Sequence, residues 1–391
     1  MYKRNQVFAA ACLGLLLFGM TLITLGSILP ILSDKFGNDG FSAAVAVSLL
    51  PLGILAGSLV FGPIVDRYGY KLLLAASILV SALAMAGIAL TYNLLLLYTC
   101  IFFIGLGGGI INGGTSALVA DISEANKGAN LSILGVFFGI GALGMPLLLG
   151  LLSRQFDYRQ ILLAVGIFMF LTVAYFLFIK FPAPKQAQGF PVKEGVKLLK
   201  EPVLLLSAFF LFFQSGLESL VNNWTTSFFQ DQIKTSDEDA LYALSFSLLG
   251  LTLARILLGG LLKKFSPLGV LLVSLLLVGL GGLLLLFANT YSFAFAALVV
   301  CGIGIAAGFP VILGYIGQLY ASLSGTAFSI AFVIALGGNM IINYIFGRIA
   351  AQAGTQYLPI AILACILCMI ALLFFIQQKI TVRPNLIHPN V

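Results

Sequence analysis

The sequence predicts an all-α polytopic membrane protein with twelve transmembrane helices in two six-helix halves. The first observation is composition: 61% of the 391 residues are hydrophobic and 8% are charged, whereas soluble domains carry roughly 25% charged residues. The second is that apolar runs of about 20 residues, each long enough to cross a hydrocarbon core of about 30 Å as a helix, recur along the whole chain. The third is an internal repeat of glycine positions, which indicates two similar halves.

Short polar links separate the apolar runs of the first half. The first run follows Lys3 and Arg4. It is longer than the ~7–15-residue apolar region of a secretory signal, and further spans follow it, so we interpret it as a retained helix. The polar links lie at 33–40, 62–71, 91–93, 121–130 and 154–159. The expected spans are 7–32, 43–64, 72–90, 94–120, 131–152 and a sixth that ends near residue 180.

The composition changes after residue 180, where a polar and proline-bearing segment begins. This segment, 181–202, is the expected cytoplasmic linker, and 192–201 could form a short interfacial helix within it. It separates an amino-terminal half, 1–180, from a carboxy-terminal half with a short cytoplasmic tail, 203–391. The second half repeats the plan of the first, with expected spans at 203–230, 240–262, 267–288, 291–319, 325–350 and 355–377.

The internal repeat has one unbroken offset. Five pairs of glycines are each separated by 197 residues: 53 and 250, 62 and 259, 105 and 302, 107 and 304, and 141 and 338. Five matches in one register indicate two homologous halves with the same topology. Parallel repeats of this kind in membrane transporters place the substrate between the halves, near the bilayer midplane.

The positive charges indicate orientation rather than a nucleic-acid partner. The net charge is +7, but the lysines and arginines lie in the short links between spans and form no single basic face. With the amino terminus inside, cytoplasmic segments hold fourteen of them and the opposite side holds five. Both termini are therefore expected in the cytoplasm.

Neither a metal site nor an enzymatic site is expected. The five cysteines all fall inside apolar spans, and Cys365-x-x-Cys368 is no exception. The single histidine, His388, is in the tail, so the chain has no plausible set of metal ligands at membrane depth. No Ser/His/Asp set and no paired carboxylates are found there either, which argues against catalysis.

The link 62–71 is the most distinctive stretch of the chain and reads Gly62-Pro-Ile-Val-Asp66-Arg67-Tyr-Gly69-Tyr-Lys71. So short a link predicts an antiparallel helix hairpin whose glycines allow close approach of the backbones. The link resembles the signature of the major facilitator superfamily, Gly-x-x-x-Asp-Arg-x-Gly-Arg-Lys, but carries Tyr70 where that family usually has Arg. The resemblance implies that Asp66 faces the amino-terminal end of helix 11, near Gly325, and holds the outward-open state. The expected latch residues are Gly62, Asp66, Arg67 and Gly69.

The span 203–230 carries an unusual polar face. Glu218 is the only one of the thirteen acidic residues deep inside a span, where a carboxylate costs about 2.5–3.5 kcal/mol on insertion scales. Gln214, Glu218, Asn222 and Thr225 recur at spacings of four, four and three, which places them on one helical face. We interpret this face as lining a cavity, although Glu218 could instead be a structural carboxylate tied to a neighbouring helix. Trp224 could stack on a sugar ring or lie at the membrane interface.

Other polar residues within spans allow more than one interpretation. Arg255 lies toward the cytoplasmic end of its span and could snorkel, form an interhelical salt bridge or contact substrate. Asn339 and Asn343 are one turn apart and could line the cavity or bond to adjacent helices.

Several stretches are similar to the fucose-permease branch of the superfamily, especially its glucose/mannose:proton symporters. These are Gly216-Leu-Glu218 with Asn223-Trp224, the glycine-rich stretch around Asn112, 138–146 and 302–310. The resemblance covers most of the chain and implies a sugar substrate. It also shows a departure, because the chain carries Asn112 where that branch commonly has Glu.

The sequence thus predicts a secondary active transporter that moves a neutral, hexose-type sugar by alternating access, with proton symport. Neutral amides suit an uncharged polyol because they offer donors and acceptors without a charge to desolvate. Burial favours the neutral form of a carboxyl group, so Glu218 is the expected proton carrier. The expected substrate-binding residues are Asn112, Gln214, Glu218, Asn222, Asn223, Trp224, Asn339 and Asn343.

Two alternatives stay open, namely a small-organic or drug exporter of the same fold and a sugar uniporter. The expected cofactors are none beyond a proton or another coupling cation. The expected partners are the sugar and the lipid bilayer, with no nucleic acid, and we expect a monomer in the inner (plasma) membrane.

Overall fold

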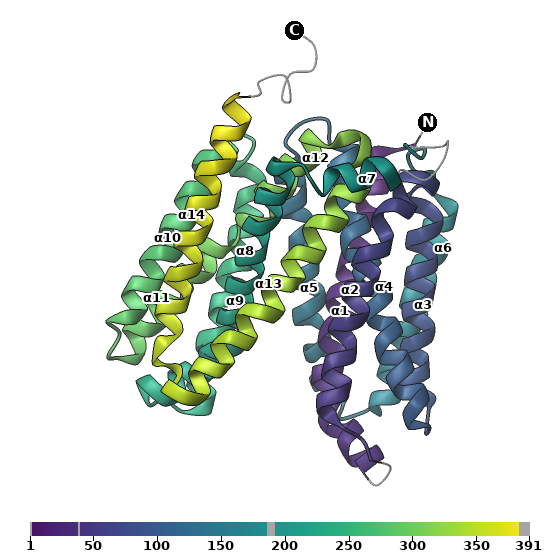
Figure 1. The fold of residues 1–391 in the computed structure, drawn as a ribbon. Helices are drawn as coiled ribbons and strands as arrows, with labels where there is room; N and C mark the ends of the chain where they lie inside the picture. The colour runs from purple at the N-terminus through teal and green to yellow at the C-terminus, as the bar shows by residue number, and fades with distance from the viewer. Residues whose placement is uncertain (1, 38–39, 186–191, 383–391) are drawn as a thin grey trace. The chain divides into compact units, whose positions relative to one another are not determined.

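The computed structural model describes residues 2–37, 40–185 and 192–382 (Figure 1). All regular structure within these residues is helical, which confirms the all-α class. The first seven helices are α1 (Arg4–Phe36), α2 (Ala43–Tyr68), α3 (Tyr70–Leu90), α4 (Leu94–Ile122), α5 (Lys127–Leu152), α6 (Tyr158–Phe178) and α7 (Val192–Leu198). The next seven are α8 (Pro202–Phe228), α9 (Asp237–Leu261), α10 (Pro267–Leu286), α11 (Tyr291–Ile305), α12 (Gly308–Leu319), α13 (Ser324–Ala353) and α14 (Leu358–Val382).

Twelve helical stretches in the described part of the chain are long and apolar enough to cross a membrane, which confirms the predicted number of spans. The seventh stretch continues from α8 into a π-helical turn, Phe229–Ile233, and the tenth comprises α11 and α12. The short helix expected in the linker is α7, which ends three residues before the predicted boundary. Linker residues 186–191 and tail residues 383–391, including His388, lie outside the described residues.

The tenth span is interrupted, which the sequence analysis did not predict. Regular α-helix stops at Ile305 and resumes at Gly308. Pro310 explains the position of the break, because proline has no N–H to donate four residues back and its ring collides with the carbonyl group there. That carbonyl belongs to Ala306, where α11 has just ended.

The chain forms two compact units. Unit 1 comprises Met1–Ile122, Leu134–Gly195 and Ser322–Ser329. Unit 2 comprises Ser123–Ile133, Val196–Ala321 and Ile330–Val391. Each predicted half thus supplies one short segment to the other unit, and the predicted ranges of the halves stay a prediction.

Polar and backbone contacts explain both exchanged segments. In unit 2, the hydroxyl group of Ser132 donates to the backbone carbonyl of Arg255 at 2.7 Å. A Cβ atom on Gly128 would lie 3.3 Å from the carbonyl oxygen of Pro310, so the start of α5 packs directly on α12. In unit 1, the first residues of α13 bond to the end of α2, as described below.

Two pairs of the repeated glycines make equivalent contacts in the two units. A Cβ atom on Gly105 would collide with the carbonyl oxygen of Leu50, and one on Gly302 would collide with that of Ser247. Leu50 and Ser247 are themselves 197 residues apart, as are the two glycines. A second set shows the same packing. A Cβ atom on Gly107 would lie 2.8 Å from the carbonyl oxygen of Ser77, and one on Gly304 would lie 2.8 Å from that of Ser274. Close backbone packing therefore explains the periodic glycines.

We predict that Gly109→Ala lowers the stability of unit 1. The new methyl group would collide with the carbonyl group of Ile54 and force α2 and α4 apart, at a cost of about 1–3 kcal/mol. Thermal unfolding of the detergent-solubilised protein, followed by size-exclusion chromatography, measures the loss. Gly144→Ala is the control, because a Cβ atom on Gly144 would have no neighbour within 4 Å and alanine favours helix. An unchanged melting temperature for Gly109→Ala would contradict the packing argument.

Candidate functional site

A single glycine, Gly69, forms the turn between α2 and α3. Gly69 has φ +79°, a left-handed conformation that costs glycine little. Its N–H donates to the carbonyl oxygen of Val65 at 2.8 Å, so α2 ends one residue before it and α3 begins one residue after it. The turn places Asp66 in the last turn of α2 and Tyr70 at the start of α3. Both side chains are buried.

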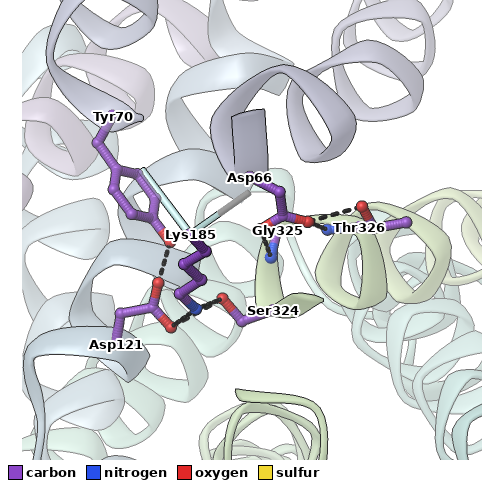
Figure 2. Close-up of polar contacts among 7 residues, drawn as sticks. All are labelled: Asp66, Tyr70, Asp121, Lys185, Ser324, Gly325 and Thr326. Atoms are coloured by element: carbon purple, nitrogen blue, oxygen red, sulfur yellow. Dashed lines mark hydrogen bonds and ion pairs between the residues drawn. The ribbon is translucent and has the colours of Figure 1, made fainter. Parts of the chain in front are cut away.

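Asp66 is bound by the amino terminus of α13. Its Oδ1 accepts the N–H of Gly325 at 3.0 Å, and its Oδ2 accepts the N–H of Thr326 at 2.8 Å and the Thr326 hydroxyl at 2.7 Å (Figure 2). The first N–H groups of a helix have no partner within the helix and carry partial positive charge, so they favour a carboxylate. The expected contact of Asp66 near Gly325 is therefore present, and the carboxylate is 0% exposed.

Two glycines permit this approach. A Cβ atom on Gly62 would lie 2.5 Å from the carbonyl oxygen of Gly325, and one on Gly325 would lie 2.7 Å from Oδ1 of Asp66. Any larger side chain at either position would separate α2 from α13. Arg67, the fourth expected latch residue, lies over the ring of Tyr68, with its Cζ 5.1 Å from the ring centroid.

A second carboxylate lies beside the first. Asp121, at the end of α4, has a 7% exposed side chain and forms an ion pair with Lys185 at 2.6 Å. It also accepts hydrogen bonds from the hydroxyl groups of Tyr70 and, at 2.7 Å, Ser324 (Figure 2). Lys185 in turn donates to the Ser324 hydroxyl at 2.6 Å. Sequence reasoning missed this cluster, for which the only signal was the charged link that begins at residue 121.

Glu218, the expected proton carrier, has a charged partner. Its Oε1 lies 3.6 Å from Nη2 of Arg255, and the two side chains are 21% and 9% exposed. Glu218 lies in the middle of α8 and Arg255 lies in α9. Of the interpretations considered for Arg255, the structure contains the interhelical ion pair. Removing either partner would leave the other charge poorly compensated in a medium of low polarity.

Gln214 makes a structural contact in unit 2. Its Nε2 donates to the carbonyl oxygen of Ile305 at 2.9 Å, where α11 ends. A Cβ atom on Gly308 would collide with its Oε1, so the amide also packs against the start of α12. Gln214 thus bonds to the backbone carbonyl at which α11 ends, next to the break in the tenth span. Its expected role in substrate binding stays a prediction.

Asn343 is the centre of an amide cluster between α8 and α13. Its Oδ1 accepts from Nδ2 of Asn223 at 3.2 Å and from Nε1 of Trp224 at 3.1 Å. Its Nδ2 donates to the Ser219 hydroxyl and, at 2.8 Å, to the backbone carbonyl of Asn339. All the donors of Asn343 and both lone pairs of its oxygen are therefore used. The indole of Trp224 also packs edge-on against Phe346, with 5.1 Å between ring centroids.

Three of the expected binding residues keep their amide groups available. Asn112 in unit 1 and Asn222 and Asn339 in unit 2 are half-buried. Within the described residues, their side chains make no hydrogen bond. A half-buried amide without a protein partner can bond to water or to a polar ligand, so these residues fit the expected binding role better than Gln214 and Asn343 do.

Twelve span-length apolar helices, with an ion pair and available amide groups among those of unit 2, are typical of a polytopic membrane protein. The chain belongs to the Major Facilitator Superfamily, whose family model matches residues 11–268 and 218–387. It is therefore a multi-pass transporter, of a superfamily whose members are not enzymes.

Known relatives differ in their substrates. The chain is 26% identical to the multi-drug resistance efflux pump PmrA of Streptococcus pneumoniae over 206 residues, which cover 51% of this chain and only about half (52%) of the pump. It is 24% identical to the glucose/mannose transporter GlcP of Bacillus subtilis over 346 residues, which cover 84% of each protein. The fucose:proton symporter FucP of E. coli, in its outward conformation, has the same fold, with a TM-score of 0.80, 18% identity and coverage of 95% of this chain and 98% of FucP.

We predict that Asn343→Ala destabilises the protein and that Asn222→Ala does not. The first change leaves the indole N–H of Trp224 without its acceptor, at about 1–3 kcal/mol, and removes one of the two hydrogen bonds of the Ser219 hydroxyl, which still donates to the carbonyl oxygen of Gly216. The second removes an amide that makes no hydrogen bond in the described structure, so its effect should stay within about 0.5 kcal/mol. Thermal unfolding in detergent compares them, and equal losses would contradict the division between bonded and available amides.

Proposed function

We propose that the protein is a secondary transporter that moves a neutral, hexose-type sugar across the membrane by alternating access, in symport with protons. The observation that carries the proposal is the polar face of α8, where an acidic residue paired with arginine lies one turn from an available amide, Asn222. The similarity to GlcP supports a sugar because it extends over 84% of both chains.

The charges within unit 2 favour an uncharged substrate. Glu218 and Arg255 form an ion pair with each other, so neither presents a full unbalanced charge to a ligand. Asn222 and Asn339 offer neutral donors and acceptors. A polyol can bond to such amides without bringing a charge into a medium where charge is costly.

Coupling would use the same ion pair. Protonation of Glu218 removes its negative charge and thereby its attraction to Arg255, so the α8–α9 contact weakens when a proton binds. A conformational change that exposes Glu218 to opposite sides in turn would carry the proton across. The proton is then the coupling ion, and no further cofactor is needed.

A second candidate, export of small organic molecules or drugs, is favoured by the similarity to PmrA. That match covers about half of the pump, whereas the match to GlcP covers most of both chains, so it supports drug export less strongly than the match to GlcP supports sugar transport. Sugar uniport is favoured by Asn112, because the fucose-permease branch commonly has Glu at this position.

Uptake into proteoliposomes distinguishes these functions. Radiolabelled glucose and mannose should accumulate when the lumen is alkaline and only equilibrate without a pH gradient. Equilibration under both conditions indicates uniport. Extrusion of a lipophilic dye without any sugar uptake would replace the proposal by drug export.

Replacement of Glu218 by Gln should abolish accumulation while downhill sugar exchange survives. Gln keeps the size and the hydrogen-bonding groups of the side chain, but it cannot carry a proton. Accumulation and counterflow in the same proteoliposomes measure the two activities. Glu238→Gln is the matched control, because Glu238 is an exposed acid in the first turn of α9. Uphill transport by Glu218→Gln would assign coupling to another group or ion.

We further propose that Asp66 is a latch. With both termini in the cytoplasm of a plasma-membrane monomer, the α2–α3 hairpin lies on the cytoplasmic side, and its bond to α13 holds the outward-open state. α13 is continuous from unit 1 into unit 2 at Ser329, so release of its first turn would free the two units to move.

Asp66→Asn should shift the protein toward the inward-open state. The variant loses a charge-assisted interaction with two N–H groups, and a loss of about 1.4 kcal/mol changes the ratio of the states tenfold. Distances between spin labels on the two units, measured by electron paramagnetic resonance, report this ratio. An unchanged ratio together with an unchanged transport rate would remove the latch role.

A further inference from the structure

We infer that Lys185, in the segment that joins α6 to α7, is a positioning residue of the latch and supplies the cation that pairs with Asp121. The inference rests on the proposed latch role of Asp66. It concerns the contacts between Lys185, Asp121 and Ser324, all of which lie within unit 1.

The start of α13 holds two carboxylates on consecutive residues. Asp121 bonds to Ser324, and Asp66 bonds to Gly325 and Thr326 (Figure 2). Each buried carboxylate is costly unless a cation or hydrogen-bond donors compensate its charge. Lys185 touches Asp121 at 2.6 Å and also acts on the Asp66 carboxylate through its Coulomb field.

Tyr70 explains why this cation comes from another segment. The superfamily signature has Arg at the position of Tyr70, but here a neutral hydroxyl group donates to Oδ2 of Asp121. Oδ1 of the same carboxylate remains for Lys185 and Ser324. Tyr70 therefore provides a hydrogen bond to one carboxylate oxygen of Asp121 but does not compensate its negative charge. Lys185 compensates that charge at the other oxygen.

The backbone before Lys185 is held against the hairpin. A Cβ atom on Gly69 would lie 3.4 Å from Cγ of Pro184, so the pyrrolidine ring packs on the turn itself. Farther back, the ring of Phe181 contacts that of Phe176 in α6, with 5.5 Å between centroids. Lys185 thus leaves an anchored stretch, and its ammonium group reaches between α4 and α13.

The consequence is that the latch depends on four helices, α2, α3, α4 and α13, and on one connecting segment rather than on the hairpin alone. The Lys185 side chain is 25% exposed and that of Asp121 is 7% exposed. Salt should therefore weaken the pair in part, since exposed charges are screened and buried ones are not.

The test uses the full chain in proteoliposomes and the same spin-label distances as for Asp66. Lys185→Gln should shift the ratio of inward-open to outward-open protein in the same direction as Asp66→Asn, by roughly threefold to tenfold. Lys185→Arg should restore the ratio to within twofold of the unmodified protein. Lys180→Gln is the matched control, because Lys180 is an exposed lysine five residues earlier on the same segment.

A double variant tests the pairing itself. If Lys185 acts through Asp121, Lys185→Gln combined with Asp121→Asn should shift the ratio by less than the sum of the two single changes. Raising the ionic strength should make the ratio of inward-open to outward-open protein more similar between Lys185→Gln and the unmodified protein. Lys185→Met, which keeps the length of the side chain, serves if the Gln variant does not fold.

Two outcomes separate this inference from the proposed latch. If Asp66→Asn shifts the ratio and Lys185→Gln matches Lys180→Gln, the role of Lys185 is wrong and the latch stands. If neither Asp66→Asn nor Lys185→Gln shifts the ratio, the latch itself is wrong, and Lys185 positions nothing. Because the distances need no added substrate, neither result depends on the identity of the sugar.

Discussion

The burial of Asp66 against the first turn of α13 is the interaction on which the rest of unit 1 depends. A carboxylate without solvent needs donors, and the free N–H groups at a helix start need an acceptor, so each compensates the other. The contact requires close backbones, which Gly62 and Gly325 provide. It also draws Ser324 to the end of α4, where Asp121 and Lys185 complete the cluster.

The same constraint organises unit 2. Pro310 interrupts the tenth span, and Gln214 from α8 bonds to the backbone carbonyl of Ile305 beside this break. The amide of Asn343 similarly ties Ser219 and Trp224 of α8 to α13. Because lipid cannot satisfy such groups, several polar side chains are committed to holding helices together. The residues that are not committed in this way are the better candidates for contact with a substrate.

The sequence alone predicts most of the fold and part of the site. Span number and position follow from apolar length, and the contact of Asp66 with the start of α13 follows from the hairpin signature. Helical spacing correctly places Gln214, Glu218 and Asn222 on one element, but it does not say what lies opposite them. The ion pair of Asp121 with Lys185 joins residues 64 positions apart, and nothing in the local pattern of either residue specifies the other. Pro310 marks the break in the tenth span, yet nothing near it in the sequence indicates that Gln214, 91 residues before Ile305, bonds to the backbone there.

The ion pair within unit 2 bears on the choice between a sugar and a lipophilic cation. Export of cationic drugs requires an acidic group whose charge is free to attract the substrate, since burial of an uncompensated cation is costly. Glu218 is instead 3.6 Å from Arg255, so its charge is already balanced. A neutral polyol brings no charge that would compete with that pair, and the amides of Asn222 and Asn339 offer the hydrogen-bonding groups that such a molecule needs. In the proposed function, recognition by neutral amides is therefore separate from coupling by the ion pair.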